Sequence, residues 1–399
     1  MKTLQFKKIL VFCILSTIFN HMYSQSSLTS QKFWSIRMAS TLMEKFINAS
    51  DYPWGKWSYP QGYMLMGMNK LWQSTQDKKY FDYIMAYANE QVDNEGNLRH
   101  FKGWSMDDMM TGSVIVWAYT QTKEPRFKIA AEKIRKSFED YPRSSDSIFW
   151  HNKDLKGEIW IDGVFMGEMF LTMYGKYIDD GTYCFNEAAR QLIGINKHLK
   201  KGETGLMYHA WDEDKDASWA DKETGLSCDV WGEGLGWYAL MIVETLDLMP
   251  SNHPRRKALE DIAKKLMYGL KNTQDSKTGL WYDIVDKGNE PGNFLEASGT
   301  SMFLYALKKS MDLNLINATE FKPVVDKAYK GLITKAQVSP VHGLVNVIDA
   351  CDGVGVQNNY QSYVNYPKQI NAKEAVAGFL WGTWIYEKDE IGKMYLKKK

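Results

Sequence analysis

The feature that most constrains the fold is a short pattern that recurs six times along the chain of 399 residues. In each copy a polar or acidic residue is followed within a few positions by glycine, and an apolar run with helical spacing comes next. The six copies are Tyr59–Gly62, Asp107–Gly112, Asp162–Gly163, Glu233–Gly234, Glu296–Gly299 and Glu374–Gly378. Their leading residues are 48, 55, 71, 63 and 78 positions apart, which leaves room each time for one further helix and a return.

More charged segments with one apolar face lie between these copies, for example residues 128–138 and 255–271. Strand-like alternation is brief and rare, and no Pro-rich or Ser-rich linker divides the chain. Alternating apolar and amphipathic helices predict an all-α fold, an (α/α)6 barrel in which inner helices begin on one face and outer helices close the ring. The same periodicity also allows an irregular helical solenoid.

The N-terminus begins with basic residues, continues with an apolar run from Ile9 to Phe19 and ends near Ser24 with small polar residues. This pattern predicts a secretory signal at residues 1–24, because the run is too short to cross a bilayer. Residues 25–399 would then form a single catalytic domain, periplasmic or secreted, with no membrane contact after the signal is removed. Three widely spaced cysteines follow the signal, which indicates neither a disulfide framework nor a zinc site.

The charge balance excludes one class of partner. Lys plus Arg number 49 against 48 Asp plus Glu, with no basic stripe, so the electrostatic pattern of a nucleic-acid-binding protein is missing. Aromatic residues make up 14% of the chain, and many lie beside polar residues. Flat rings beside polar groups suit sugar binding, although core packing accounts for most of them.

Two interpretations compete for the acid in each repeated copy. A carboxylate at the start of a helix is a favourable N-cap, yet six such caps around one mouth would gather carboxyls in one pocket. Asp162 follows Trp160 and precedes Val164 and Phe165, whose apolar side chains would raise its pKa and keep it protonated. Asp107 is its best partner for general acid/base chemistry, and one of Asp107 and Asp108 is expected to cap the helix.

Two histidines and a tryptophan-rich segment add to this site. His151 and His209 are flanked by aromatic residues in loops that lead to inner helices, where they would serve as hydrogen-bond donors. No metal-ligand spacing connects them, so we expect no catalytic metal. In residues 229–237 the rings of Trp231 and Trp237 surround Glu233 together with three glycines, which let the backbone approach a ligand closely.

Four sequence motifs, in this order along the chain, are specific enough to indicate a protein family: Trp160–Met166, Tyr208–Asp212, Trp231–Trp237 and Gly292–Gly299. Together they resemble glycoside hydrolase family 105, the unsaturated rhamnogalacturonyl hydrolases and their relatives, over nearly all of the mature chain. The resemblance implies a cofactor-independent enzyme with an (α/α)6 barrel. It also implies exolytic removal of a 4,5-unsaturated uronic acid from the non-reducing end of oligosaccharides made by polysaccharide lyases, by hydration of the C4=C5 double bond.

The resemblance also assigns roles to residues of this chain. Asp162 matches the general acid/base and Asp107 the second essential carboxylate. His151, His209 and Trp237 match substrate-contacting positions, and Tyr59 fits an aromatic stacking position. The full set of expected substrate-binding residues is Tyr59, Asp108, His151, Trp160, His209, Trp211, Trp231, Glu233 and Trp237.

One position departs from the family pattern. Where the family commonly has Arg between Trp and Gly, this chain has Glu233, and an ionised acid cannot pair with a uronate carboxylate. Recognition would then rest on other donors, and the parent polysaccharide is left open between pectic rhamnogalacturonan and the sulfated algal polymer ulvan. Other functions also remain open: an ordinary inverting glycosidase, a sugar epimerase that uses a histidine pair, and a non-enzymatic carbohydrate-binding protein.

Overall fold

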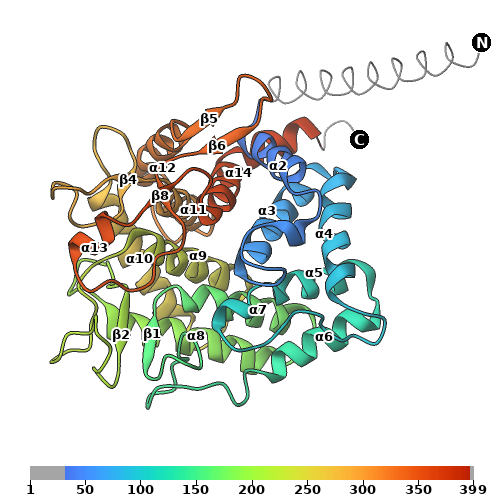
Figure 1. Ribbon diagram of the computed structural model, residues 1–399, viewed down its shortest axis with the longest axis horizontal. Helices are drawn as coiled ribbons and strands as arrows, with labels where there is room; N and C mark the ends of the chain where they lie inside the picture. The colour runs from blue at the N-terminus through green and yellow to red at the C-terminus, as the bar shows by residue number, and fades with distance from the viewer. Residues whose placement is uncertain (1–31, 396–399) are drawn as a thin grey trace, which may run out of the picture.

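The computed structural model of the protein describes residues 32–395, so the predicted signal at residues 1–24 lies outside them. Six helices form an inner ring, and they are apolar over most of their circumference (Figure 1). These helices are α3 (Tyr59–Thr75), α5 (Gly112–Thr122), α7 (Gly163–Tyr177), α9 (Gly232–Leu248), α11 (Ala297–Asp312) and α14 (Lys373–Tyr395). Each packs against the next, and α14 packs against α3, so the ring closes. The closed (α/α)6 barrel is therefore confirmed and the irregular solenoid is excluded.

Six further helices surround this ring, and each buries only one face. They are α2 (Trp34–Lys45), α4 (Lys78–Gln91), α6 (Pro125–Lys136), α8 (Gly181–Leu199), α10 (Arg256–Thr273) and α12 (Ala318–Ile333). The two outer helices expected at residues 128–138 and 255–271 correspond to α6 and α10, within three residues at each end. No helix among residues 32–395 is both long and apolar enough to cross a membrane.

The hairpin that closes the ring joins the two ends of the described chain. Helix α2 packs on α14, and the Glu387 carboxylate of α14 accepts the backbone N–H groups of Trp34 and Ser35 at 2.9 and 3.0 Å. A carboxylate from one helix thus satisfies the free N–H groups at the start of another. The first and last helices are thereby held together across more than 350 residues of sequence.

The repeated glycines lie where neighbouring inner helices approach each other closely. A Cβ added at Gly62 of α3 would lie 2.9 Å from the Cα of Thr111, just before α5. A Cβ added at Gly299 of α11 would lie 2.9 Å from the carbonyl carbon of Gly232, the first residue of α9. Any side chain at these positions would force the helix ends apart, because backbone atoms cannot yield as a flexible side chain can.

Short two-stranded sheets build the rim of the barrel at the end where the inner helices begin. The antiparallel pairs are β1 (Glu158–Trp160) with β2 (Ala210–Asp212), β3 (Trp281–Tyr282) with β4 (Leu295–Glu296), β5 (Ala336–Val338) with β6 (Val345–Val347), and β7 (Ala350–Cys351) with β8 (Lys368–Gln369). Strands β1, β4 and β8 each precede an inner helix by no more than three residues. The remaining short elements are the 3-10 turns η1 (Ala49–Asp51) and η2 (Met106–Asp108) and helix α13 (Tyr360–Val364).

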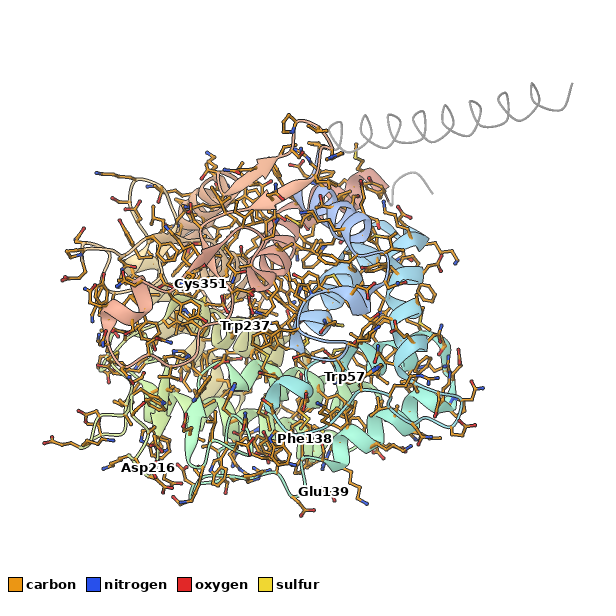
Figure 2. The ribbon with its side chains drawn as sticks, in the orientation of Figure 1. Trp57, Phe138, Glu139, Asp216, Trp237 and Cys351 are labelled. Atoms are coloured by element: carbon orange, nitrogen blue, oxygen red, sulfur yellow. The ribbon has the colours of Figure 1, made fainter. Side chains whose placement is uncertain are left out.

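Aromatic side chains fill the centre of the ring. Trp237 lies near the middle of the projected barrel (Figure 2), and its ring centroid is 4.6 Å from that of Tyr63 and 4.9 Å from that of Phe165. Trp381 of α14 lies 5.0 Å from Tyr63 on the same cluster. The barrel is therefore a packed core rather than a channel, and a ligand can enter only from an end.

We expect Gly299→Ala to lower the free energy of unfolding by about 1–3 kcal/mol, because the added methyl group meets the α9 backbone. Gly392→Ala in α14 is the matched control, since a Cβ there meets nothing within 4 Å and alanine favours a helix by up to about 1 kcal/mol. Urea denaturation followed by circular dichroism measures both. Equal behaviour of the two variants would contradict the close approach of α9 and α11.

Candidate active site

A cavity of about 240 Å³ lies at the end of the barrel where the inner helices begin. Most of the residues expected at the site line it: Tyr59, Asp107, His151, Trp160, Asp162, Trp231, Glu233 and Trp237. They come from five different helices or loops, because each inner helix delivers its first residues to the same mouth. Ring closure thus brings four of the six repeated polar positions, Tyr59, Asp107, Asp162 and Glu233, into one pocket.

Asp162 occupies the N-cap position of α7 but does not act as a cap. Its side chain makes no capping hydrogen bond, and its Oδ1 is buried without a hydrogen-bond partner among the described residues. Glu296, by contrast, caps α11 by accepting the N–H groups of Ser298 and Gly299. Burial raises the pKa of Asp162, while His151 and nearby backbone N–H groups act in the opposite direction. Burial is the largest of these effects, so the pocket favours the protonated form of Asp162.

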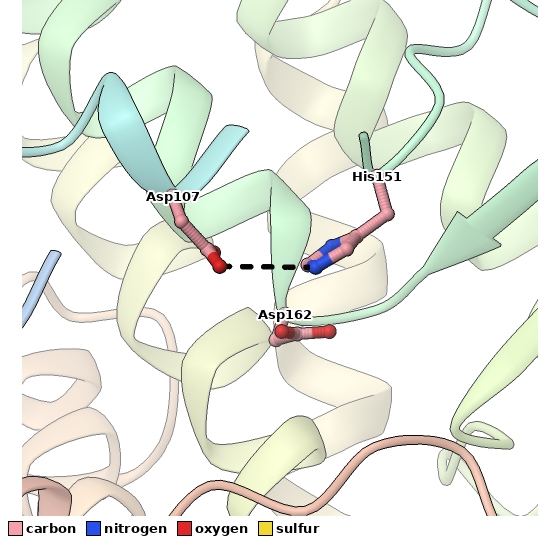
Figure 3. A group of neighbouring side chains, drawn as sticks. All are labelled: Asp107, His151 and Asp162. Carbon is pink, nitrogen blue, oxygen red and sulfur yellow. Dashed lines mark ion pairs between the residues drawn. The ribbon is translucent and has the colours of Figure 1, made fainter. Parts of the chain in front are cut away.

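Asp107 lies on the turn η2, and its carboxyl points toward His151 with the Asp162 carboxyl close beside both (Figure 3). Its Oδ2 is 4.0 Å from Nε2 of His151. Burial raises the pKa of Asp107 to about 6; His151 opposes this rise, and the negative charges of Asp162, Asp108 and Glu374 add to it. The pKa of both carboxyls is therefore raised by burial, and the negative charge of Asp162 contributes to the rise at Asp107.

Trp160 and His151 form one wall of the pocket. Their rings stack with centroids 4.3 Å apart and an interplanar angle of 14°. The indole N–H of Trp160 donates to Glu158 at 2.8 Å, and the backbone N–H of His151 donates to the Glu158 carbonyl at 2.9 Å. Strand β1 therefore fixes both rings, which exclude water from one side of the Asp162 carboxyl.

The opposite wall contains residues that the sequence interpretation missed. Trp54 and the segment Gly353–Gly355 line the cavity, and behind them the Lys373 Nζ lies 4.0 Å from the centre of the Trp54 ring. Lys373 is fully buried and pairs with Glu374 at 2.8 Å and with Asp352 at 3.1 Å. Glu374 also accepts the hydroxyl of Tyr59. The pair Lys373–Glu374 at the sixth repeated copy was the available signal, because a lysine there has no role in an apolar helix start.

Three residues expected to contact the substrate, Asp108, His209 and Trp211, do not line the cavity. The carboxylate of Asp108 accepts the N–H groups of Trp104 and Ser105, at 2.8 and 3.3 Å, so Asp108 is the cap and Asp107 is the free acid. Neither Trp211 nor His209 lines the cavity. Trp211 stacks on His198 at 3.9 Å, outside the barrel mouth.

His209 lies one layer behind the wall. Its Nδ1 is 2.7 Å from the Tyr363 hydroxyl, and its ring packs against Trp231 with centroids 4.4 Å apart. Burial, together with His151, lowers the pKa of His209 to about 3. The ring is therefore neutral at physiological pH, and its packing helps to hold Trp231 in the wall.

A larger cavity of about 330 Å³ lies at the other end of the barrel, where the inner helices end. Its charged groups already pair with one another: Lys70 with Glu244 at 3.4 Å and Lys309 with Asp247 at 2.7 Å. Indole rings stack beneath Lys70, whose Nζ is 4.1 Å from the Trp381 ring. None of the six repeated polar positions reaches this cavity, so the smaller one is the candidate active site.

Asp107, His151 and Asp162 are also the group of described residues that best fits a metal ion. Each offers one ligand atom, and these atoms lie within 4.8 Å of one another. Water molecules complete the coordination of many metal sites, and three protein ligands are enough for a catalytic Zn²⁺. The expectation of no catalytic metal therefore stays a prediction.

Comparisons with known proteins agree on one family. The model described as Glycosyl Hydrolase Family 88 matches residues 34–388. The sequence is 23% identical over 317 residues to the unsaturated rhamnogalacturonyl hydrolase YesR of Bacillus subtilis, which covers 78% of this chain and 84% of YesR. It is also 23% identical over 349 residues to an unsaturated 3S-rhamnoglycuronyl hydrolase of Formosa agariphila, covering 82% and 86% of the two chains.

A solved structure extends this result to the whole barrel. The structure of a glycoside hydrolase from family 105 of C. acetobutylicum ATCC 824 superimposes with a TM-score of 0.84 at 32% sequence identity. The match covers 90% of this chain and 99% of that chain.

The raised pKa of Asp107 gives a prediction about stability. The folded protein binds this proton more tightly than the unfolded chain does, so the free energy of unfolding falls as pH rises from about 4 to about 6. Asp107→Asn removes the ionising group and should raise the free energy of unfolding at neutral pH by about 1–3 kcal/mol. The gain should nearly vanish at about pH 4. Urea denaturation at both pH values measures it; an equal change at both would contradict the prediction.

We expect that the protein needs no metal at this site, because a pair of carboxyls can transfer protons without one. Dialysis against EDTA should leave the melting temperature unchanged, and added Zn²⁺, Mn²⁺ or Ca²⁺ should not raise it, because a ligand stabilises only a state that binds it. Differential scanning fluorimetry measures the shift. A rise that is lost in Asp162→Asn would instead identify a metal centre.

Proposed function

Because the chain belongs to glycoside hydrolase family 105, we propose that this glycoside hydrolase removes a 4,5-unsaturated uronic acid from the non-reducing end of short oligosaccharides. The reaction would begin with hydration of the C4=C5 double bond. The observation that carries the proposal is the close pair of carboxyls, Asp107 and Asp162, which share one side of a cavity walled by indole rings.

The spacing of the two carboxyls disfavours the ordinary inverting glycosidase. An inverting enzyme keeps its carboxyl groups about 6.5–9.5 Å apart, so that a water molecule fits on the far side of the sugar ring. Here one oxygen of Asp107 and one of Asp162 lie within 4.8 Å of each other. Two carboxyls on the same side suit the addition of a proton and a hydroxyl to adjacent carbons.

In the proposed mechanism Asp162 transfers its proton to C4, and positive charge develops at C5, where the ring oxygen stabilises it. Water adds to C5 and gives its second proton to the Asp162 carboxylate, which restores the acid. The product is a hemiketal at C5. When its ring opens, C5 becomes a ketone and C1 a hemiacetal, which breaks down to an aldehyde and releases the next sugar.

Asp107 and His151 would support the proton transfer by Asp162 from their positions in the pocket wall. Below about pH 6 the raised pKa of Asp107 keeps that carboxyl neutral, which removes its charge repulsion with Asp162. The His151 Nδ1 is buried with no hydrogen-bond partner among the described residues, which leaves it available to a substrate hydroxyl or carboxylate. Both groups lie within 4.8 Å of the Asp162 carboxyl.

The structure also weighs against the histidine-based epimerase. That mechanism requires two imidazoles on opposite faces of one sugar carbon. His151 lines the cavity, but His209 is buried behind Trp160 and Trp231. The low pKa of His209 further removes it from proton transfer at neutral pH.

The size of the cavity and the names of the relatives support a substrate that ends in an unsaturated uronic acid. About 240 Å³ is smaller than the roughly 300–1,000 Å³ of sites for drug-sized ligands, so the pocket fits one terminal sugar and not the interior of a chain. YesR acts on unsaturated rhamnogalacturonyl and the Formosa relative on unsaturated 3S-rhamnoglycuronyl substrates, as their names state. We infer that rhamnose is the leaving sugar and, from the predicted signal, that the enzyme acts in the periplasm or outside the cell.

The central test follows the loss of ultraviolet absorbance of the conjugated double bond with unsaturated disaccharides from pectin, ulvan and glycosaminoglycans. We expect turnover with a rhamnose-containing substrate and a loss of at least about 1,000-fold in kcat for Asp162→Asn, because the amide cannot donate a proton to carbon. Asp108→Asn is the matched control: an amide oxygen can still accept the N–H groups of Trp104 and Ser105, so this neighbouring variant should retain activity.

Two outcomes would contradict the proposal. Release of sugar from saturated oligosaccharides with no change in absorbance would support the alternative that the protein is an ordinary inverting glycosidase. An unchanged rate in Asp162→Asn would remove this residue from the mechanism and leave Asp107 as the acid.

A further inference from the structure

The Ser298 hydroxyl lies between two buried carboxyls and can satisfy only one of them. Its Oγ is 2.8 Å from Oε2 of Glu233 and 2.7 Å from Oε1 of Glu296. A serine hydroxyl carries a single hydrogen and can otherwise only accept. One of the two carboxyls must therefore hold a proton and donate it to Ser298, or two lone pairs would face each other in a buried site.

Glu296 is the partner that loses its proton first. Burial raises the pKa of Glu296 to about 7, against the opposing effect of its hydrogen bonds from Ser298 and Gly299, whereas the pKa of Glu233 is raised well above its usual range. It is the N-cap of α11, where Oε1 accepts the N–H of Ser298 at 2.8 Å and Oε2 accepts the N–H of Gly299 at 2.6 Å. Two backbone donors and a helix N-terminus stabilise a carboxylate. The Ser298 hydrogen is then directed to Glu296, and the hydrogen in the Glu233 contact must come from Glu233 itself.

Among the described residues around Glu233, the one positively charged group is already paired with other carboxylates. The titratable groups that face it are Glu296 before α11, Lys373 and Glu374 of α14, Tyr59 and Tyr63 of α3, and Cys351 of β7. Lys373 is the one cation in this set, and Glu374 and Asp352 already pair with it. Burial, followed by the charges of Glu374 and Glu296, raises the pKa of Glu233 well above its usual range.

We propose that Glu233 is a neutral carboxylic acid, held protonated by the relay Glu233–Ser298–Glu296, and that it is a specificity-determining contact for the unsaturated uronyl residue. Its Oε2 is occupied by Ser298, and among the described residues its Oε1 has no hydrogen-bond partner. Because Glu233 lines the cavity, Oε1 is left as an acceptor for a sugar hydroxyl. An ionised Glu233 would repel the uronate carboxylate, whereas the neutral acid admits it.

Infrared spectroscopy tests the protonation state without any substrate. The difference spectrum between the wild-type protein and Glu233→Gln at neutral pH should show the loss of a protonated carboxyl C=O band that shifts in D₂O. Glu290→Gln, which removes an exposed carboxyl, is the matched control and should lose only a carboxylate band. Loss of a carboxylate band in Glu233→Gln would overturn the proposal.

Kinetics test the contact with the sugar, and this part rests on the proposed function. With an unsaturated uronyl-rhamnose disaccharide, Glu233→Gln should raise KM by about threefold or less, because the amide keeps a neutral acceptor and a donor to Ser298. Glu233→Ala should raise KM by about tenfold or more with a smaller change in kcat, since the substrate hydroxyl loses its acceptor. Equal KM values for the wild type and both variants would overturn the contact.

The two tests separate two kinds of failure. If no unsaturated disaccharide is turned over, the proposed function fails, while the infrared result still decides whether Glu233 is protonated. If turnover occurs and the infrared band is that of a carboxylate, the function stands and the relay is wrong.

Discussion

The rest of the structure depends on one constraint: six apolar helices must begin at the same end of a closed ring. Closure is secured where Glu387 of α14 receives the free N–H groups of α2, and glycines allow the inner helices to approach one another at their starts. The ends that carry free N–H groups and partial positive charge therefore converge on one mouth. Carboxyls placed at these ends become neighbours whether or not each one is needed as a cap.

The converging acids have different electrostatic environments although their sequence positions are alike. Glu296 accepts two backbone N–H groups, and Glu374 is paired with Lys373 and Tyr59. Among the residues described, Asp162 has no cap bond, and the one hydrogen bond of Glu233 joins it to the Ser298 hydroxyl, which also contacts Glu296. Burial without compensation costs stability and raises a carboxyl pKa, so the uncompensated acids are the ones suited to hold and deliver protons.

The walls of the pocket come from the segments between the helices, and these were the hardest part to predict. Asp107 and Asp108 are adjacent in sequence, and only the turn η2 shows that Asp108 accepts backbone N–H groups while Asp107 faces Asp162. His209 and Trp211 lie in an aromatic motif, but the hairpin β1–β2 directs them behind and outside the wall. Trp54 and Gly353–Gly355 belong to loops without periodicity, so no local pattern marked them.

The sequence by itself determined the repeated helix starts, the all-α barrel and the pairing of Asp162 with Asp107. These follow from hydrophobic periodicity and glycine spacing, which are local patterns that can be read directly from the sequence. Only the tertiary structure decided which acids are caps, which are paired and which are left free. A protonation state depends on burial and on partners from distant parts of the chain, such as Lys373 beside Glu374 or Ser298 between Glu233 and Glu296. These contacts join segments as much as 315 residues apart, as in the hydrogen bond from Tyr59 to Glu374, and no window of sequence contains them.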